Sequence, residues 1–328
     1  MNLRPVRLEP QFVQRIWGAR SLSPLFPEKK SLAEPIGEVW LTGNECKFAD
    51  GPFAGQKLGE VWPKLTEEWI GRGLRRDGPF PLLVKFIFPE DKLSVQVHPD
   101  DTYARAHEAA AGGVGKTEMW YVVSARAGAE VRVGMKPEAD RELFRRAITE
   151  GSAENCVAAV PVRAGDTIFV PAGTVHTIGP GMILCEIQQN SDITYRVFDY
   201  NRLTSEGKPR ELHIEKAMDV IRFGQQQGGK MTLAAAKEAS GEMSVLVECP
   251  YFVAAKSVFL HREYRSRRKP VFELLIVLEG RGKIEVPGGA VEYEPAQAWF
   301  VPASVRDCVF APEKRTVMLH AWVPTEEK

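Results

Sequence analysis

The stretch GDTIFVPAGTVH, at residues 165–176, indicates the fold of this chain. Its run of β-branched and aromatic residues is typical of a strand, and the PAG turn that follows leads directly to a histidine. A related stretch, AQAWFVPASVRD, lies at residues 296–307. Four positions pair at a constant separation of 131 residues: Gly165 with Ala296, Pro171 with Pro302, Gly173 with Ser304, and His176 with Asp307. The pattern favours two copies of one β-unit, the second without its histidine, over chance similarity between two strand–turn–strand units.

Strand-like segments surround both copies. Residues 81–200 contain short runs rich in Val, Ile, Phe and Tyr, broken by Gly, Pro and Asp, and such runs resume at about residue 242. This texture is typical of a β-sandwich or barrel. Short helices are expected within residues 58–71, 140–150 and 211–224. The sequence therefore predicts a mainly β fold of two jelly-roll barrels with a small helical portion, divided into domains at residues 1–235 and 236–328.

Composition limits the partners of the protein. Lys and Arg number 43, and so do Asp and Glu, so no net charge favours binding to nucleic acid or to a membrane surface. Apolar runs such as 274–278 are too short to cross a bilayer, and the first twenty residues lack the apolar block of a signal peptide. The five cysteines are odd in number and widely spaced, which indicates reduced thiols in a cytoplasmic protein. Oligomeric state is left open.

Four residues form a candidate metal site. Gln96 and His98 alternate along a strand-like run, so both point to one face. Glu118 begins another such run, and His176 follows the PAG turn. One amide, one carboxylate and two imidazoles without a thiolate suit a catalytic zinc, because structural zinc sites are usually cysteine-rich. Each residue alone is more often structural, and it is the joint pattern that favours ligation.

The spacing Gly-x5-Pro-x-Gly-x2-His is the second motif of the cupin superfamily, and the Q-x-H with a later glutamate supplies the ligands of the first motif. We therefore expect residues 1–235 to be a catalytic zinc-binding cupin domain with helical insertions. Residues 236–328 would be a degenerate cupin-like domain. The other histidines (His107, His213, His261 and His320) lack such a setting, and core or surface roles are expected for them.

A competing motif lies at residues 110–117. The segment AAGGVGKT fits a relaxed phosphate-binding loop, which requires a strand before it and a helix after it. Here the preceding segment, TYARAHEAAAG, is helix-like and the following one, EMWYVV, is strand-like. The reversed order argues against nucleotide binding.

The segments SVQVHPDD, GKTEMW and SDITYR, together with residues 165–176, resemble class I mannose-6-phosphate isomerases of the shorter bacterial type. The likeness extends from IWG at 16–18, through PIGEVW at 35–40, to FDYNR at 198–202. It implies interconversion of D-mannose 6-phosphate and D-fructose 6-phosphate with one zinc per chain. By position, Gln96, His98, Glu118 and His176 match the zinc ligands of the family.

The same resemblance implies catalytic roles for Arg196 and Lys116, and it also matches Asp192. Glu186 is a candidate base. Longer members have a histidine before the lysine, where this chain has Gly115. The expected reaction passes through an enediol(ate), whose charge a metal and cationic side chains would stabilise. Alternatives are a cupin isomerase for another sugar or sugar phosphate, a non-catalytic metal-binding sugar sensor and, less favoured, a metal-dependent dioxygenase.

Overall fold

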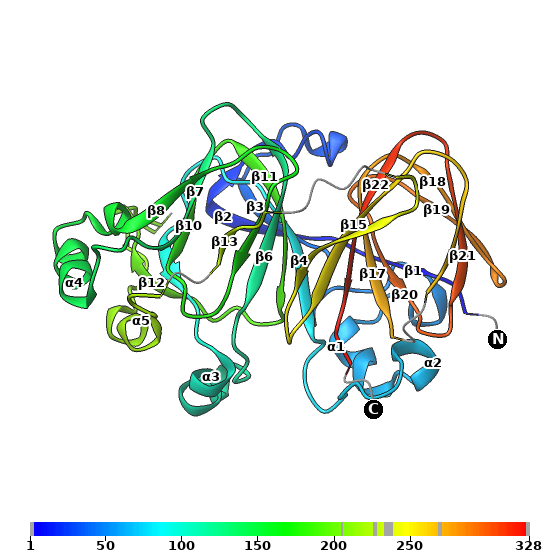
Figure 1. Ribbon diagram of the computed structural model, residues 1–328, viewed down its shortest axis with the longest axis horizontal. Coiled ribbons are helices and arrows are strands. Elements are labelled where there is room, and N and C mark those ends of the chain that lie inside the picture. The colour runs from blue at the N-terminus through cyan, green and yellow to red at the C-terminus, as the bar shows by residue number, and fades with distance from the viewer. Residues whose placement is uncertain (1–2, 205, 226–227, 233–238, 268–270, 326–328) are drawn as a thin grey trace.

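The computed structural model describes residues 3–204, 206–225, 228–232, 239–267 and 271–325. It is built from antiparallel sheets with a few short helices, so the expectation of a mainly β chain with a small helical portion is confirmed (Figure 1). Two sheets belong mostly to the first two thirds of the chain and two mostly to the last third. The two pairs of sheets lie side by side along the long axis of the molecule and form its first and second halves.

The first half contains a seven-stranded and a five-stranded sheet. The seven-stranded sheet has the order β13 (Gly229–Lys230), β9 (Thr167–Val170), β6 (Glu118–Ala125), β11 (Met182–Gln189), β4 (Leu82–Ile87), β3 (Ile36–Trp40) and β2 (Gln11–Ala19). The five-stranded sheet has the order β12 (Tyr195–Phe198), β5 (Val95–Val97), β10 (His176–Ile178), β7 (Glu130–Met135) and β8 (Val157–Pro161).

The second half contains a six-stranded and a four-stranded sheet. The six-stranded sheet has the order β1 (Val6–Leu8), β20 (Ala298–Val301), β17 (Glu273–Glu279), β22 (Thr316–Trp322), β15 (Val253–Phe259) and β14 (Met243–Glu248). The four-stranded sheet has the order β16 (Glu263–Ser266), β21 (Asp307–Pro312), β18 (Gly282–Val286) and β19 (Gly289–Tyr293). Strand β1 pairs with β20, so the start of the chain lies in the second half.

Alternation along the strands divides the core into layers. On β4, Val84 and Phe86 belong to a large central core that also contains Leu274 and Ile276 of β17, so the seven- and six-stranded sheets pack against each other. The opposite faces of these sheets bury separate cores. Trp120 of β6 lies in one of them, between the seven- and five-stranded sheets. Each buried aromatic or large aliphatic side chain contributes about 1.5–3 kcal/mol.

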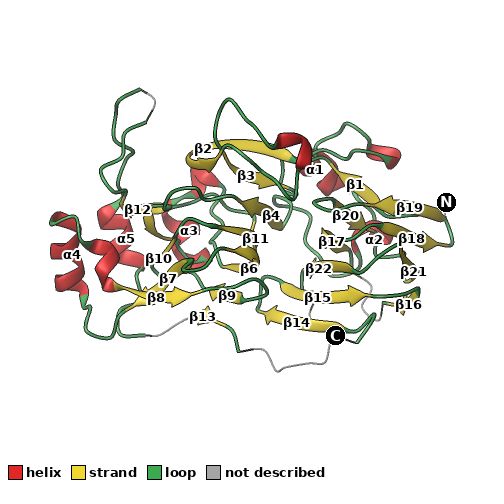
Figure 2. Cartoon of the chain, turned by 90° about the horizontal axis from the view of Figure 1, so that it is seen from above, coloured by secondary structure: helices red, strands yellow, loops and turns green. Residues whose placement is uncertain are grey.

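Short helices lie outside the sheets (Figure 2). α4 (Arg141–Thr149) and α5 (Ile214–Val220) lie at the far end of the first half, and α3 (Asp101–His107) lies below the sheets of that half in Figure 1. α1 (Leu58–Val61) and α2 (Glu67–Ile70) lie below the second half in the same view. Single turns of 3₁₀ helix occur at Pro27–Lys29, Gly51–Phe53, Trp62–Lys64, Ala109–Ala111 and Ala153–Cys156. Among the described residues, no helix has the length and apolar character needed to cross a membrane.

The expected helices are present, with one correction to their bounds. α5 is shorter than the predicted 211–224 because its ends are held by other partners. Glu211 gives its carbonyl to Arg196, and Ile221 has an extended conformation (φ −66°, ψ 130°). The segment 110–117 lies between α3 and β6, so no helix begins after Lys116. A phosphate-binding loop is excluded there.

The two related stretches take corresponding positions. Val170 of β9 pairs with Glu118, the first residue of β6, and Val301 of β20 pairs with Glu273, the first residue of β17. Gly165 and Ala296 both have a positive φ, 91° and 64°, although Ala296 carries a side chain. The predicted domain boundary at 235/236 falls within residues 233–238, outside the described residues, and the division into domains stays a prediction.

Candidate metal centre

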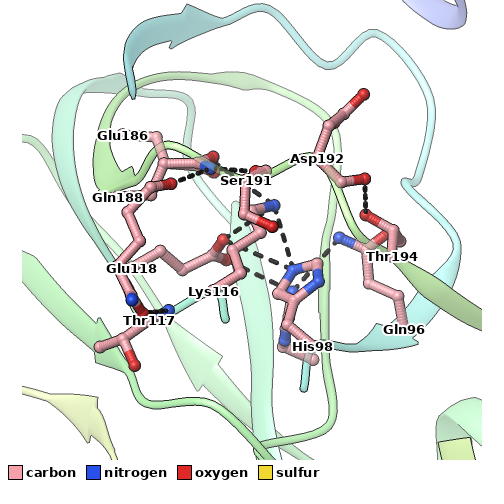
Figure 3. A network of polar contacts seen from close by, with 12 residues as sticks. Gln96, His98, Lys116, Thr117, Glu118, Glu186, Gln188, Ser191, Asp192 and Thr194 are labelled. Carbon is pink, nitrogen blue, oxygen red and sulfur yellow. Dashed lines mark hydrogen bonds and ion pairs between the residues drawn. The ribbon is translucent and has the colours of Figure 1, made fainter. Parts of the chain in front are cut away.

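Three predicted ligands meet between the two sheets of the first half. His98 follows the end of β5, Glu118 begins β6 and His176 begins β10. Their ligand atoms lie within 4.8 Å of one another, and the three side chains are buried. Figure 3 shows His98 and Glu118 converging with Lys116. The ends of three strands that are separated along the sequence therefore bring these side chains together.

Hydrogen bonds orient both imidazoles. Nδ1 of His98 lies 2.9 Å from the carbonyl oxygen of Ile193, and Nδ1 of His176 lies 2.9 Å from that of Thr174. Because a carbonyl only accepts, each Nδ1–H donates and each Nε2 presents a lone pair. The two Nε2 atoms lie 3.5 and 3.4 Å from the carboxylate oxygens of Glu118.

Burial keeps both imidazoles neutral. Loss of hydration lowers the pKa of His176 to about 4, with the nearby Lys116 acting in the same direction. Burial and Lys116 likewise lower the pKa of His98 well below its usual value. Neutral imidazole is the form that binds a metal ion, so the two rings are in the ligating state at neutral pH.

Gln96 lies directly across from His176 in the β5–β10 pair. Its Nε2 is 3.2 Å from Nε2 of His176, and its Oε1 accepts a hydrogen bond from Ser94 at 3.1 Å. The structure thus brings all four predicted ligands into one site. Gln96 presents its amide nitrogen to His176, whereas a metal ion would be bound by the amide oxygen.

The donor set fits a divalent cation. Oε2 of Glu118 is buried and forms an ion pair with the ammonium of Lys116 at 3.1 Å. One carboxylate and two inward imidazole lone pairs form an oxygen–nitrogen set of the kind that zinc binds. In the described part of the chain this is the single group of three or more such residues found within metal-binding reach.

A chain of alternating charges runs from the centre to the edge of the seven-stranded sheet. Lys116 lies 3.1 Å from Glu118 and 3.9 Å from Glu186. Lys85 lies 3.0 Å from Glu186 and 3.4 Å from Glu38. Arg15 ends the chain, 2.7 Å from Glu38. Indole N–H groups add support, because Trp120 donates to Glu186 and Trp40 to Glu38.

The charge states along this chain follow from burial and neighbours. Burial would raise the pKa of Glu38, but Lys85, Arg15 and the Trp40 hydrogen bond outweigh it and lower that pKa to about 2. Burial and the like charge of Glu118 raise the pKa of Glu186. Glu38 is therefore a fixed anion, whereas Glu186 is more easily protonated than an ordinary glutamate.

A cavity of about 630 Å³ lies beside the centre, lined by Gln96, Lys116 and Glu186 among others. Asp192 and Arg196 also line it. Arg196 pairs with Gln96 across β12 and β5, and its Nη1 donates to the carbonyl of Glu211 at 2.9 Å. Its buried Nε has no hydrogen-bond partner, and no carboxylate of the described residues forms an ion pair with it. Burial and then the nearby Arg210 lower the pKa of Arg196.

Sequence reasoning missed Arg15, Glu38, Lys85 and Arg210, all of which line this cavity. A signal existed for Lys85, because a lysine in the middle of the apolar run PLLVKFIF needs a buried partner. His213 was expected to have only a core or surface role, but it lines the cavity and accepts a hydrogen bond from the Arg196 backbone at 3.4 Å.

Gly115 has a steric reason to be glycine. A Cβ at this position would lie 2.5 Å from the backbone nitrogen of Asp101 and 2.6 Å from the carbonyl carbon of Asp100. Its backbone N–H donates to Asp101 at 2.8 Å. The loop before Lys116 therefore packs too closely on α3 for a histidine to fit.

The corresponding place in the second half has different chemistry. Glu273 lies 2.9 Å from Arg265, 3.0 Å from Arg267 and 2.7 Å from His320. Asp307, the counterpart of His176, is exposed and accepts a hydrogen bond from Tyr264. Two guanidinium groups thus neutralise the glutamate that corresponds to Glu118.

Fold and site together define a mainly β protein with a buried His–Glu–His group beside a polar cavity. A family model described as "Phosphomannose isomerase type I, catalytic domain" matches residues 6–120. A mannose-6-phosphate isomerase of Streptococcus mutans is 36% identical over 86% of this chain and 87% of its own. Mannose-6-phosphate isomerase ManA of Bacillus subtilis is 34% identical over 87% and 88%.

Solved structures agree with these relatives. The crystal structure of the mannose 6-phosphate isomerase from Bacillus subtilis superposes with a TM-score of 0.87 at 29% identity, over 98% of this chain and 100% of that one. A zinc-bound mannose 6-phosphate isomerase has the same fold, with a TM-score of 0.75 at 15% identity over 98% of this chain and 100% of that one. The chain belongs to the type I phosphomannose isomerase family, and it is an isomerase.

Proposed function

We propose that this protein interconverts D-mannose 6-phosphate and D-fructose 6-phosphate with one zinc ion per chain. His98, Glu118 and His176 would hold the ion, and Gln96 would complete the set through its amide oxygen. The observation that carries the proposal is the pair of inward Nε2 lone pairs meeting Glu118 beside a cavity that Arg196 and Lys116 line. Zinc at this place would act as a Lewis acid toward the carbonyl and hydroxyl oxygens of the open-chain sugar.

The side chains of the cavity can supply the rest of the chemistry. The isomerisation removes a proton beside a carbonyl and returns it to the neighbouring carbon through an enediol(ate). Glu186, with its raised pKa, and Lys116 both line the cavity and can exchange protons. Arg196 has no carboxylate partner among the described residues and remains charged. Guanidinium N–H groups of Arg196 are therefore available to bind a negatively charged group of the substrate.

We also propose that the two halves are two cupin-type jelly rolls, a zinc-binding domain at residues 1–235 and a degenerate one at 236–328. Support comes from the matched pairs Val170–Glu118 and Val301–Glu273 in the two halves. We further propose a cytoplasmic location. All five cysteines are free, and four of them are buried (Cys46, Cys156, Cys185 and Cys308).

A substrate panel tests the proposed activity. Purified protein loaded with zinc should convert fructose 6-phosphate to mannose 6-phosphate faster than it converts other hexose phosphates or free hexoses. A faster reaction with another sugar would instead identify an isomerase of different specificity. Tight sugar binding without turnover would identify a sensor.

A further inference from the structure

Two sequence motifs have no role in the proposed function, IWG at residues 16–18 and PIGEVW at residues 35–40. They meet at the β2–β3 edge of the seven-stranded sheet. Gln14 and Ala19 both pair with Ile36, so residues 15–18 leave the regular ladder as a bulge. Bulges re-aim side chains and occur often beside active sites. Arg15 lies in this bulge and lines the cavity.

Glycine makes room for the Arg15 side chain. A Cβ on Gly37 would lie 2.5 Å from Cβ and 2.7 Å from Cγ of Arg15, and 2.7 Å from the ring of Trp17. A Cβ on Gly18 would lie 2.4 Å from the Gly37 nitrogen. Because both positions lack a side chain, the stem of Arg15 lies directly over the β3 backbone.

Buried partners then fix the Arg15 head group. Its Nη2 lies 2.7 Å from Glu38, whose carboxylate also accepts from Trp40 at 2.8 Å and lies 3.4 Å from Lys85. The Arg15 side chain remains 28% exposed, and its Nη1 contacts the Gln14 carbonyl at 3.3 Å. The guanidinium is thus oriented before any ligand binds, and it keeps N–H groups that can donate hydrogen bonds into the cavity.

Two further arginines line the same cavity. Arg196 and Arg210 line it, and Arg210 is paired with Asp199. Arg196 has no ion-pair partner among the described residues. The positive charges of Arg210, Arg202 and Arg15 act on it and outnumber the nearby negative charge of Asp199. An arrangement of arginines that faces a cavity with one of them uncompensated favours an anionic ligand.

We propose that Arg15 is a phosphate-binding residue that, with Arg196, holds the phosphate of the sugar substrate between β2 and β12. This inference rests on the proposed function. The planar fork of a guanidinium matches phosphate oxygens and gives short, charge-assisted hydrogen bonds, which a neutral hydroxymethyl group would not replace. Arg15 therefore contributes selectivity for phosphorylated over free sugars, and the two motifs serve to present it.

Binding of an unreactive analogue tests the proposal without turnover. Isothermal titration would compare mannitol 1-phosphate with mannitol on the zinc-loaded wild type, Arg15→Gln, Arg15→Lys and Gly37→Ala. Arg15→Gln should weaken binding of the phosphorylated ligand by about 10- to 100-fold, far more than that of mannitol. Arg15→Lys should lie between, and Gly37→Ala should act like Arg15→Gln because its methyl group displaces the arginine.

Arg75→Gln is the matched control, because Arg75 is an exposed arginine paired with Asp77 and lies outside the cavity lining. Equal losses for the two ligands, or no loss, would overturn the proposal, and so would a wild type that does not prefer the phosphorylated ligand. If Arg15→Gln unfolds, the same comparison of the two ligands on Arg15→Lys tests the proposal. Arg15-dependent phosphate binding without isomerisation of mannose 6-phosphate would contradict the proposed function alone.

Discussion

Glu118 and Glu273 each begin a strand and pair with corresponding valines, Val170 and Val301, yet their carboxylates contact chemically different side chains. Glu118 faces the lone pairs of two neutral imidazoles, whereas Glu273 faces two guanidinium groups. In the second half, arginine side chains therefore supply the positive charge beside the glutamate. The first has Lys116 and a donor set that fits a metal ion.

This contrast predicts one tightly bound metal per chain and two different mutant phenotypes. Glu118→Gln should lose the metal but keep most of the fold. Glu273→Gln should keep the metal but lose about 3–5 kcal/mol of stability, because the buried Arg267 and the partly buried Arg265 lose their counterion. Elemental analysis and chemical unfolding measure the two effects. Two ions per chain, with one lost in each variant, would contradict the assignment.

Arg196→Ala should reduce turnover without releasing the metal. Within the described part of the chain the Arg196 guanidinium has no carboxylate partner, so its removal deprives the substrate of a positive charge rather than breaking an ion pair. A loss of one charge-assisted interaction corresponds to about 10- to 100-fold in kcat/KM. Steady-state kinetics and zinc content are measured on the same preparation. A variant that loses zinc in proportion to activity would show that Arg196 supports the metal centre instead.

Glu38 predicts a specific pH dependence of stability. Its pKa is about 2 in the folded protein, below the usual 4.5, so its contribution is complete above pH 4.5 and is lost as the pH falls toward 2. The difference in unfolding free energy between wild type and Glu38→Gln should shrink by about 1.4 kcal/mol per pH unit across that window. Denaturant unfolding at several pH values from 6 to 3 would measure it. A difference that stays constant with pH would contradict the ion-pair account.

The sequence identified residues that meet at the candidate metal centre, but it identified few of those that line the cavity beside it. Gln96, His98 and His176 follow from the period of a strand and from one turn, both of which are local. The chain from Arg15 through Glu38 and Lys85 to Glu186 joins β2, β3, β4 and β11, and β11 lies far from the other three along the sequence although it is next to β4 in the sheet. Lys85 and Glu186 pair directly across strands, although 101 positions separate them along the chain. No pattern within a short stretch of sequence predicts such a pairing.

Solvent labelling should show that a proton, not a hydride, moves between the two carbons. The cavity contains groups that exchange protons, such as Glu186 and Lys116, and cations that stabilise an enediol(ate). In deuterated water, deuterium should enter the product at the carbon that receives the proton, as read by NMR. Lack of label by itself is also expected of a shielded base. Complete intramolecular transfer that persists in Glu186→Gln and Lys116→Met variants would contradict the prediction.

We propose that the His–Glu–His group binds the zinc that the isomerase reaction needs. The most direct measurement is conversion of fructose 6-phosphate by one preparation before chelation, after chelation and after zinc is restored, with His176→Ala carried through the same steps. We predict that wild-type activity disappears on chelation and returns with one equivalent of zinc, while His176→Ala stays folded and inactive at every step. Full activity of the chelated protein, or full zinc content and turnover in His176→Ala, would contradict the account.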